Sequence, residues 1–134
     1  MAGYSGTPLP KKLGIKPASR VLLLNAPDAF TLTDLPEGVT IARDLRSQQE
    51  AEVIVLFCSN ARDMTARFAK CVQRLSTAGG LWVAWPKKAS GVPTDLHDLL
   101  VRSYGLDQGL VDNKVCAIDE VWSALRFVRR KNER

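Results

Sequence analysis

The sequence has few of the residues from which metal sites, disulfide frameworks and membrane spans are built. Its 134 residues include one histidine and three cysteines, Cys58, Cys71 and Cys116, which are widely spaced among apolar neighbours. This pattern is neither a disulfide framework nor a set of metal ligands, and it indicates a reducing compartment. No apolar run approaches the roughly 20 residues of a membrane span, and the N-terminus lacks the basic-then-apolar order of a secretory signal. The sequence therefore predicts a cytoplasmic protein without a metal or a membrane partner.

The length and composition are those of one globular domain. A chain of 134 residues buries about 68% of its unfolded surface without disulfides or metals, and 46% apolar and 25% charged residues are ordinary proportions. Residues 1–10 are small, polar and interrupted by proline. We therefore expect an N-terminal arm over 1–18, a single α/β domain over 19–131 and a short tail over 132–134.

Basic residues concentrate at both ends of the chain, which carries a net charge of +5. They are Lys11, Lys12, Lys16 and Arg20 near the start, and Arg126, Arg129, Arg130, Lys131 and Arg134 near the end. Such clusters attract phosphate, but no aromatic residues alternate with them as in a surface that stacks on bases. We interpret them as solvated termini and keep non-specific nucleic-acid binding as a third hypothesis.

The stretch at residues 79–88, Gly-Gly-Leu-Trp-Val-Ala-Trp-Pro-Lys-Lys, organises the predicted fold. A continuous apolar run bounded by glycine and proline is typical of a central strand that is buried on both faces. The prediction is that the two glycines end a preceding helix and that Pro86 ends the strand.

Other apolar runs predict strands at 20–24, 39–42 and 53–57. The second of these is short and contains Thr40, which favours a position near the edge, and the charged stretch 43–52 is expected to be a shortened connection. Two final strands are predicted at 114–119 and 121–129, joined by a tight turn. Residues 121–129 also fit the apolar face of a helix, but Trp122, Phe127 and Val128 favour a strand.

Helices are predicted between these strands. One turn is expected at 9–13, ended by Gly14, and 27–35 can form at most a short helix. Ser59 or Asn60 should cap an amphipathic helix that extends to the two glycines. Thr94 or Asp95 should cap another, which ends at Gly105 and turns Leu96, Leu99, Leu100 and Tyr104 inward. The alternation predicts a three-layer α/β fold with a mostly parallel sheet, helices on both faces and a C-terminal antiparallel pair.

The polar residues after the central strand form the main candidate site, because ligands of open α/β sheets bind beyond the carboxyl ends of the strands. Lys87 and Lys88 supply ammonium groups, while Ser90 and Thr94 supply hydroxyls. The free amides at the start of the next helix add a positive dipole end. Although the order of glycine and lysine in a P-loop is absent, the cluster predicts a site for phosphate or carboxylate.

Four further residues are candidates for lining the same crevice, and two of them are Asn25 after the first strand and Cys58 after the third. The other two, Tyr4 and Thr7, belong to a terminus whose default state is a disordered arm; the alternative is that they fold back over the crevice. Cys58 has no histidine or basic residue beside it in sequence, so buried filler is the simpler interpretation. No glycine-flanked serine of the kind that pairs with a histidine in serine hydrolases occurs in the sequence, so His97 is interpreted as a surface residue. The sequence predicts no catalytic residue.

Residues 12–24, KLGIKPASRVLLL, resemble the lead-in to the first strand of class I S-adenosylmethionine-dependent methyltransferases. In that family the phrase ends in a glycine-rich loop that holds the cofactor. Here residues 25–30 contain no glycine, and Pro27 removes an amide donor. A backbone cradle for a nucleotide needs glycine, because the chain must approach the ligand closely. The resemblance therefore implies a Rossmann-like, methyltransferase-like sheet, and we expect no cofactor in it.

Longer phrases resemble a family of small bacterial proteins of unknown function. They are GYSGTPL at 3–9, KKLGIK at 11–16, WVAWPKKASGVPTDL at 82–96 and GLVDNKVCA at 109–117. This likeness covers nearly the whole chain and implies no activity. Our leading hypothesis is a non-catalytic binding or regulatory module for a small anion or a protein partner. The alternative is a methyltransferase-like enzyme with an atypical cofactor loop.

Overall fold

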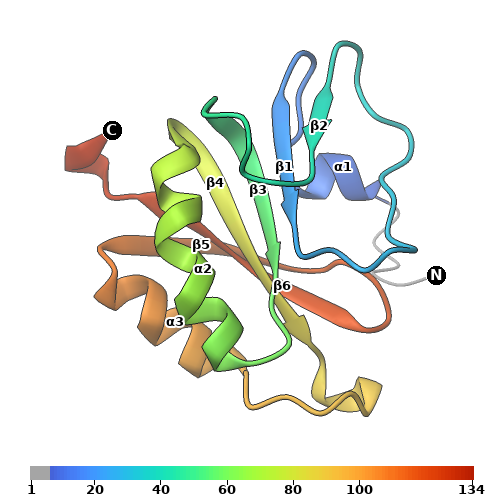
Figure 1. The fold of residues 1–134 in the computed structure, drawn as a ribbon, viewed down its shortest axis with the longest axis vertical. Coiled ribbons are helices and arrows are strands. Elements are labelled where there is room, and N and C mark those ends of the chain that lie inside the picture. The colour runs from blue at the N-terminus through green and yellow to red at the C-terminus, as the bar shows by residue number, and fades with distance from the viewer. Residues whose placement is uncertain (1–6) are drawn as a thin grey trace.

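The structure, a computed structural model, describes residues 7–134 (Figure 1). Its helices are α1 (Leu9–Lys12), α2 (Ala61–Arg74) and α3 (Asp98–Asp107), with short 3-10 turns η1 (Lys88–Ser90) and η2 (Lys131–Glu133). Its strands are β1 (Arg20–Leu24), β2 (Thr40–Ala42), β3 (Ala51–Phe57), β4 (Leu75–Pro86), β5 (Leu110–Ala117) and β6 (Trp122–Arg129). The predicted turn at 9–13 is confirmed, whereas residues 27–35 form no helix.

The six strands form one sheet in the order β2-β1-β3-β4-β6-β5. Strands β2, β1, β3 and β4 are parallel, and β6 pairs antiparallel with both β4 and β5. The α/β class, the mostly parallel sheet and the antiparallel strands at its C-terminal end are therefore confirmed. Residues 122–129 are a strand, as their aromatic and β-branched side chains indicated.

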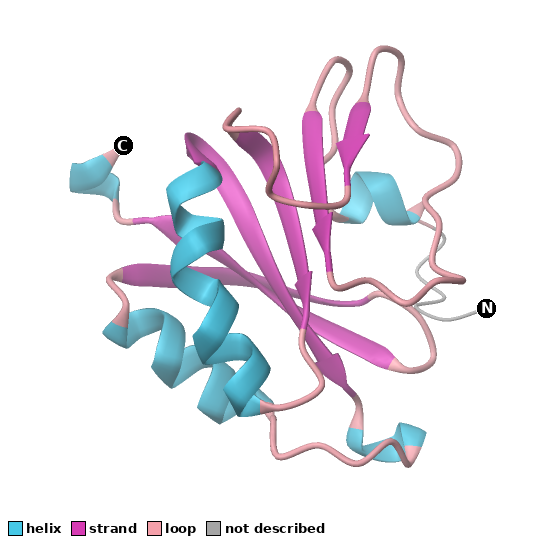
Figure 2. Cartoon of the chain, viewed as in Figure 1, coloured by secondary structure: helices cyan, strands magenta, loops and turns pink. Residues whose placement is uncertain are grey.

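The two longer helices lie on one face of the sheet and α1 on the other (Figure 2). Met64 and Phe68 of α2 and Val101 of α3 pack against alternate side chains of β1, β3, β4 and β6. On the opposite face, Leu13 and the loop over 26–39 cover the remaining sheet residues. That second face is thus covered by one short helix and coil.

Strand β4 is central, as its composition predicted. It pairs with β3 on one side and β6 on the other, and every residue from 81 to 86 is buried. The indole Nε1 of Trp82 donates to the carbonyl oxygen of Leu13 at 3.0 Å. This bond satisfies a fully buried polar group and fastens the segment after α1 to the sheet.

The prediction that Gly79 and Gly80 end α2 is wrong. The helix ends at Arg74, and β4 begins at the next residue, Leu75, which pairs with Ala51. Residues 76–79 then bulge before Gly80 pairs with Val53. A Cβ atom on Gly80 would lie 2.2 Å from Nε of Arg126, so the glycine leaves room for an arginine from the neighbouring strand.

The predicted limits of α3 are also wrong. Its N-cap is His97 rather than Thr94 or Asp95, and the helix continues past Gly105. A Cβ atom on Gly105 would lie 2.0 Å from Cε1 of Phe127, which shows that this glycine is a contact point with the sheet. Val101 and Gly105 face inward, whereas Leu99, expected to be buried, is 63% exposed and Leu100 is exposed.

Candidate functional site

The crevice between the carboxyl ends of β1 and β3 is closed by Asn25. From β1 the chain continues to β2 on one side of it and then crosses over to β3 on the other side, so the order of the strands reverses at β1. Ligands of such sheets bind at this point of reversal. The Asn25 amide Nδ2 donates to the carbonyl oxygen of Phe57 at 2.9 Å and to Oδ2 of Asp63 at 3.4 Å. Asn25 has a φ of 60°, a left-handed conformation that asparagine tolerates better than most residues. The side chain therefore bridges the two strand ends.

Cys58 directly follows Phe57, whose carbonyl accepts from Asn25, and is a buried, protonated thiol. Burial, with a smaller contribution from Asp63, raises the pKa of Cys58 to about 12. Burial likewise raises the pKa of Cys71, on the inner face of α2, to about 12. Since the thiolate is the nucleophilic form, these two cysteines are packing residues.

A compact loop at 87–97 follows β4, and its hydroxyl groups maintain its shape. The Lys87 amide donates to the carbonyl oxygen of Val121 at 2.7 Å, which holds the loop against the segment before β6. Ser90 Oγ donates to the Lys87 carbonyl at 2.6 Å and accepts from the Val92 amide at 3.2 Å. Thr94 Oγ1 accepts from the Leu96 amide at 3.0 Å. Both predicted hydroxyls thus stabilise turns within the loop.

This loop borders an open cavity of about 500 Å³, called the loop pocket from here on. Its lining consists of Lys88 and the residues from Gly91 to His97. Of the four residues predicted for an anion site, Lys88 and Thr94 line the loop pocket, whereas Lys87 and Ser90 lie outside its lining. Asp95, expected beside this site as a cap of the next helix, also lines the pocket, as does His97, which was interpreted as a surface residue.

His97 and Asp95 each cap a helix. Nδ1 of His97 accepts from the Leu100 amide at 3.3 Å, so the proton of the neutral imidazole lies on Nε2. Oδ1 of Asp95 accepts from the Ala61 amide at 2.8 Å, at the first residue of α2. The loop is therefore connected to both helices on this face, and His97 retains one N–H donor.

The other residues expected in the crevice are separated from the loop pocket. Asn25 lines a different cavity of about 500 Å³ with Asp28 and Arg43, at the ends of β1 and β2. Thr7 is exposed just before α1, and Tyr4 lies outside the described residues. The predicted residues therefore belong to at least two places along the carboxyl edge.

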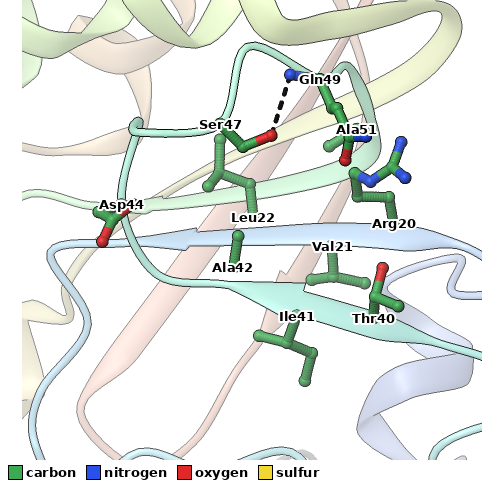
Figure 3. Close-up of a pocket in the computed structure, with 10 residues that line it drawn as sticks. All are labelled: Arg20, Val21, Leu22, Thr40, Ile41, Ala42, Asp44, Ser47, Gln49 and Ala51. Atoms are coloured by element: carbon green, nitrogen blue, oxygen red, sulfur yellow. Dashed lines mark hydrogen bonds between the residues drawn. The ribbon is translucent and has the colours of Figure 1, made fainter.

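A smaller cavity of about 160 Å³ lies where the charged connection 43–50 passes over the edge of the sheet (Figure 3). Leu22, Ala42 and Ala51 form its apolar wall, and Ser47 and Gln49 belong to the connection. Ser47 Oγ accepts from the backbone amide of Gln49 at 3.2 Å, which is a turn within the connection. The cavity has the size of a few water molecules, and its polar rim is engaged in local structure.

Comparisons with known proteins assign no family to the chain. No protein-family model matches it, and no curated protein matches it. Among residues 7–134, no three histidine, cysteine or acidic side chains are grouped as metal ligands would be. None of the helices in this part of the chain is long and apolar enough to cross a membrane.

Proposed function

We propose that this protein is a non-catalytic binding or regulatory module that holds a small anion in the loop pocket. The observation that carries the proposal is that Lys88 and His97, which carry an ammonium group and an Nε2–H donor, both line one cavity of about 500 Å³ after the end of the central strand. A pair of donors, one of them charged, suits a carboxylate or a phosphate group.

The two nearby carboxylates support this assignment because each is engaged with backbone amides. Asp95 accepts from Ala61, and Oδ1 of Asp98 accepts from the Leu99 amide at 2.8 Å. No carboxylate of the described chain lies within 4 Å of Lys88. Its ammonium group is therefore available to a ligand.

The chemistry of the surrounding residues favours binding over catalysis. The thiols of Cys58 and Cys71 have pKa values raised to about 12 by burial, so neither is an activated nucleophile at neutral pH. The imidazole of His97 is oriented by the Leu100 amide rather than by an acid that would make it a base. Free cysteines also support the proposed cytoplasmic location.

Amide chemical-shift mapping with inorganic phosphate and with acetate tests the proposal. We expect saturable shifts at residues 88–100, and Lys88→Ala should weaken them at least about tenfold, because a charge-assisted hydrogen bond is lost. Asp95→Asn should strengthen binding several-fold, since asparagine keeps an oxygen for the Ala61 amide but removes a negative charge. Lys70→Ala, an equal loss of charge on the exposed side of α2, is the control and should change nothing. Unchanged binding in Lys88→Ala would refute the site.

The strand arrangement favours the alternative, a methyltransferase-like enzyme. We propose that the three-layer, Rossmann-like sheet is a pared-down relative of the methyltransferase sheet. The antiparallel strands at its C-terminal end support this kinship, as does the helix-free connection 43–50 where a methyltransferase would place another helix and strand. The Asn25 bridge occupies the place where a cofactor would bind.

Calorimetry with S-adenosylmethionine separates the two functions. If the protein is a binding module with this bridge, S-adenosylmethionine should give no heat of binding at high micromolar protein. A dissociation constant for S-adenosylmethionine in the low micromolar range would refute the non-catalytic module and support the methyltransferase-like enzyme. In that case Asn25→Gly, which opens the bridge and provides the missing glycine, should bind S-adenosylmethionine more tightly than the natural chain.

A further inference from the structure

Arg126 is a half-buried cation whose side chain packs against the sheet. It stands opposite Trp82 in the β4–β6 pair, on the face of the sheet that carries α1. Its guanidinium occupies the space above Gly80, where any side chain on β4 would collide with it. A glycine in a central strand is costly, and here it accommodates a charged group against the sheet.

Two other cations lie beside Arg126. Lys114 is its cross-strand partner in the β5–β6 pair, so the two side chains share one face. Arg134 lies beyond the end of β6, close enough to disfavour the charge on Arg126. We call these three residues the sheet-face cluster. In the sheet β6 lies between β4 and β5, and Figure 1 shows the C-terminal turn η2, in red, beyond the end of β6.

A bulge in β5 supplies the one acceptor that the structure gives to this guanidinium. The register shifts between Asp112 and Lys114, which leaves Asn113 as the extra residue. Its Oδ1 accepts from Nη1 of Arg126 at 3.3 Å. The acceptor is neutral, so it orients the guanidinium without balancing its charge.

The charge of the sheet-face cluster is uncompensated. Within residues 7–134 no carboxylate oxygen lies within 4 Å of Arg126, Lys114 or Arg134. Burial, and then Arg134, lower the pKa of Arg126, so its surroundings oppose the charge that it carries. None of the ring contacts in this part of the chain places an aromatic side chain beneath it. Partly buried charges are usually paired, and here the partner is missing.

We propose that the sheet-face cluster is a phosphate-binding site, separate from the loop pocket and independent of the function proposed for it. Nε and Nη2 of Arg126 lie over Gly80 and receive no acceptor from the described chain, and this edge of a guanidinium can bind phosphate in a bidentate manner. Lys114 and Arg134 add positive charge nearby, which suits a doubly charged phosphate. The phosphate belongs to a small phosphorylated molecule or to a nucleic-acid strand.

The test uses the full chain, with pyrophosphate as the small probe and a single-stranded 12-residue DNA as the polymeric probe. Amide shifts at residues 112–114 and 126 report this site, whereas shifts at 88–100 report the loop pocket. Arg126→Met keeps the length and apolar contacts of the side chain and removes the charge. It should lose binding at least about tenfold and melt no lower than the natural chain in phosphate-free buffer.

Arg134→Gln is the second variant, because Arg134 is exposed and the change removes one surface hydrogen bond, from its Nε to the Arg129 carbonyl oxygen at 2.7 Å. It should weaken the same shifts. Lys88→Ala should leave the shifts at residues 112–114 and 126 unchanged. The proposal for the sheet-face cluster and the proposal for the loop pocket can therefore be refuted separately. Lys70→Ala again controls for net charge.

Pyrophosphate shifts that disappear in Arg126→Met support a small phosphorylated ligand. If only the DNA binds and Arg126→Met abolishes it, the phosphate is that of a nucleic acid. Its logarithmic salt slope should then be about −2 for three cations on a single strand. The absence of binding to either probe would overturn the proposal. Equal binding by Arg126→Met, or an equal loss in Lys70→Ala, would also overturn it.

Discussion

Replacing Gly105 with alanine should destabilise the protein, although the same exchange in an ordinary helix stabilises it. Alanine at an interior helical position is favoured over glycine by about 1 kcal/mol. At this position, however, the new Cβ would lie 2.0 Å from Cε1 and 2.4 Å from Cζ of Phe127. Carbon atoms pack at about 3.5–4.0 Å, so the ring or the helix must move by about 1.5 Å.

The ring has little room to move. Phe127 is fully buried and its ring centroid lies 5.8 Å from that of Phe68 in an edge-to-face arrangement. Overpacking of this kind costs about 1–3 kcal/mol. After subtracting the gain of about 1 kcal/mol in helix propensity, we expect Gly105→Ala to lower the free energy of unfolding by up to about 2 kcal/mol.

Urea unfolding followed by circular dichroism measures this loss of stability. The slope of the free energy of unfolding against urea concentration should be the same in the variant and the natural chain. Phe127→Leu should relieve the collision, so the double variant should be more stable than the sum of the single effects by about 1 kcal/mol. Ala69→Gly on the exposed side of α2 gives the propensity effect alone. A Gly105→Ala protein that is more stable than the natural chain would refute the close approach of α3 to β6.

Three further perturbations test other parts of the structure. Val83→Asp places an unpaired charge in the central strand and should cost several kcal/mol, enough to unfold a small domain. A variant that melts cooperatively would contradict the burial of β4. Asp95→Ala removes the acceptor of the Ala61 amide and should lower the urea midpoint by the equivalent of about 1 kcal/mol, whereas Asp95→Asn should not. The raised pKa values of Cys58 and Cys71 mean that unfolded thiols ionise before native ones. The free energy of unfolding should therefore fall as pH rises from about 8.5 towards 12, and less steeply in Cys58→Ala. An equal slope in that variant would contradict burial of the thiol.

The strands were predictable because burial on both faces leaves a continuous apolar run in the sequence. This holds for β1, β3 and β4, whose residues need no information from elsewhere to be recognised. It also holds for β6, where the aromatic and β-branched content decided between strand and helix. Local composition was sufficient wherever the burial of a segment is uniform.

The glycines were misinterpreted because the contacts that explain them come from distant residues. Gly80 accommodates the guanidinium of Arg126, and Gly105 accommodates the ring of Phe127. In sequence, both resemble helix ends, where glycine is also favoured. Only the pairing of β6 with β4 shows that β6 supplies both neighbours.

The candidate site was predictable in position but only partly in composition. Lys88 and Thr94 could be placed near the end of β4 because Pro86 ends that strand and ligand sites follow strand ends. Asp95 was expected to cap the next helix, but its side chain accepts from Ala61, 34 residues away. His97 then takes the cap of α3. Spacing along the chain does not reveal whether the Asp95 carboxylate accepts from the first amides of α2 or from those of α3.

The direct passage of α2 into β4 restricts how this domain can move and change. Because Leu75 follows Arg74 without a connecting loop, no hinge lies between helix and strand. Arg129 reinforces the junction by donating to the carbonyl oxygens of Val72 and Leu75. The amides of α2 and β4 should therefore exchange with solvent through one shared opening event. Insertions and proteolytic cuts should instead fall in coils such as those at 25–39 and 43–50. A lid or additional subdomain inserted in either of these coils would arise beside β1 and β2, next to the Asn25 bridge.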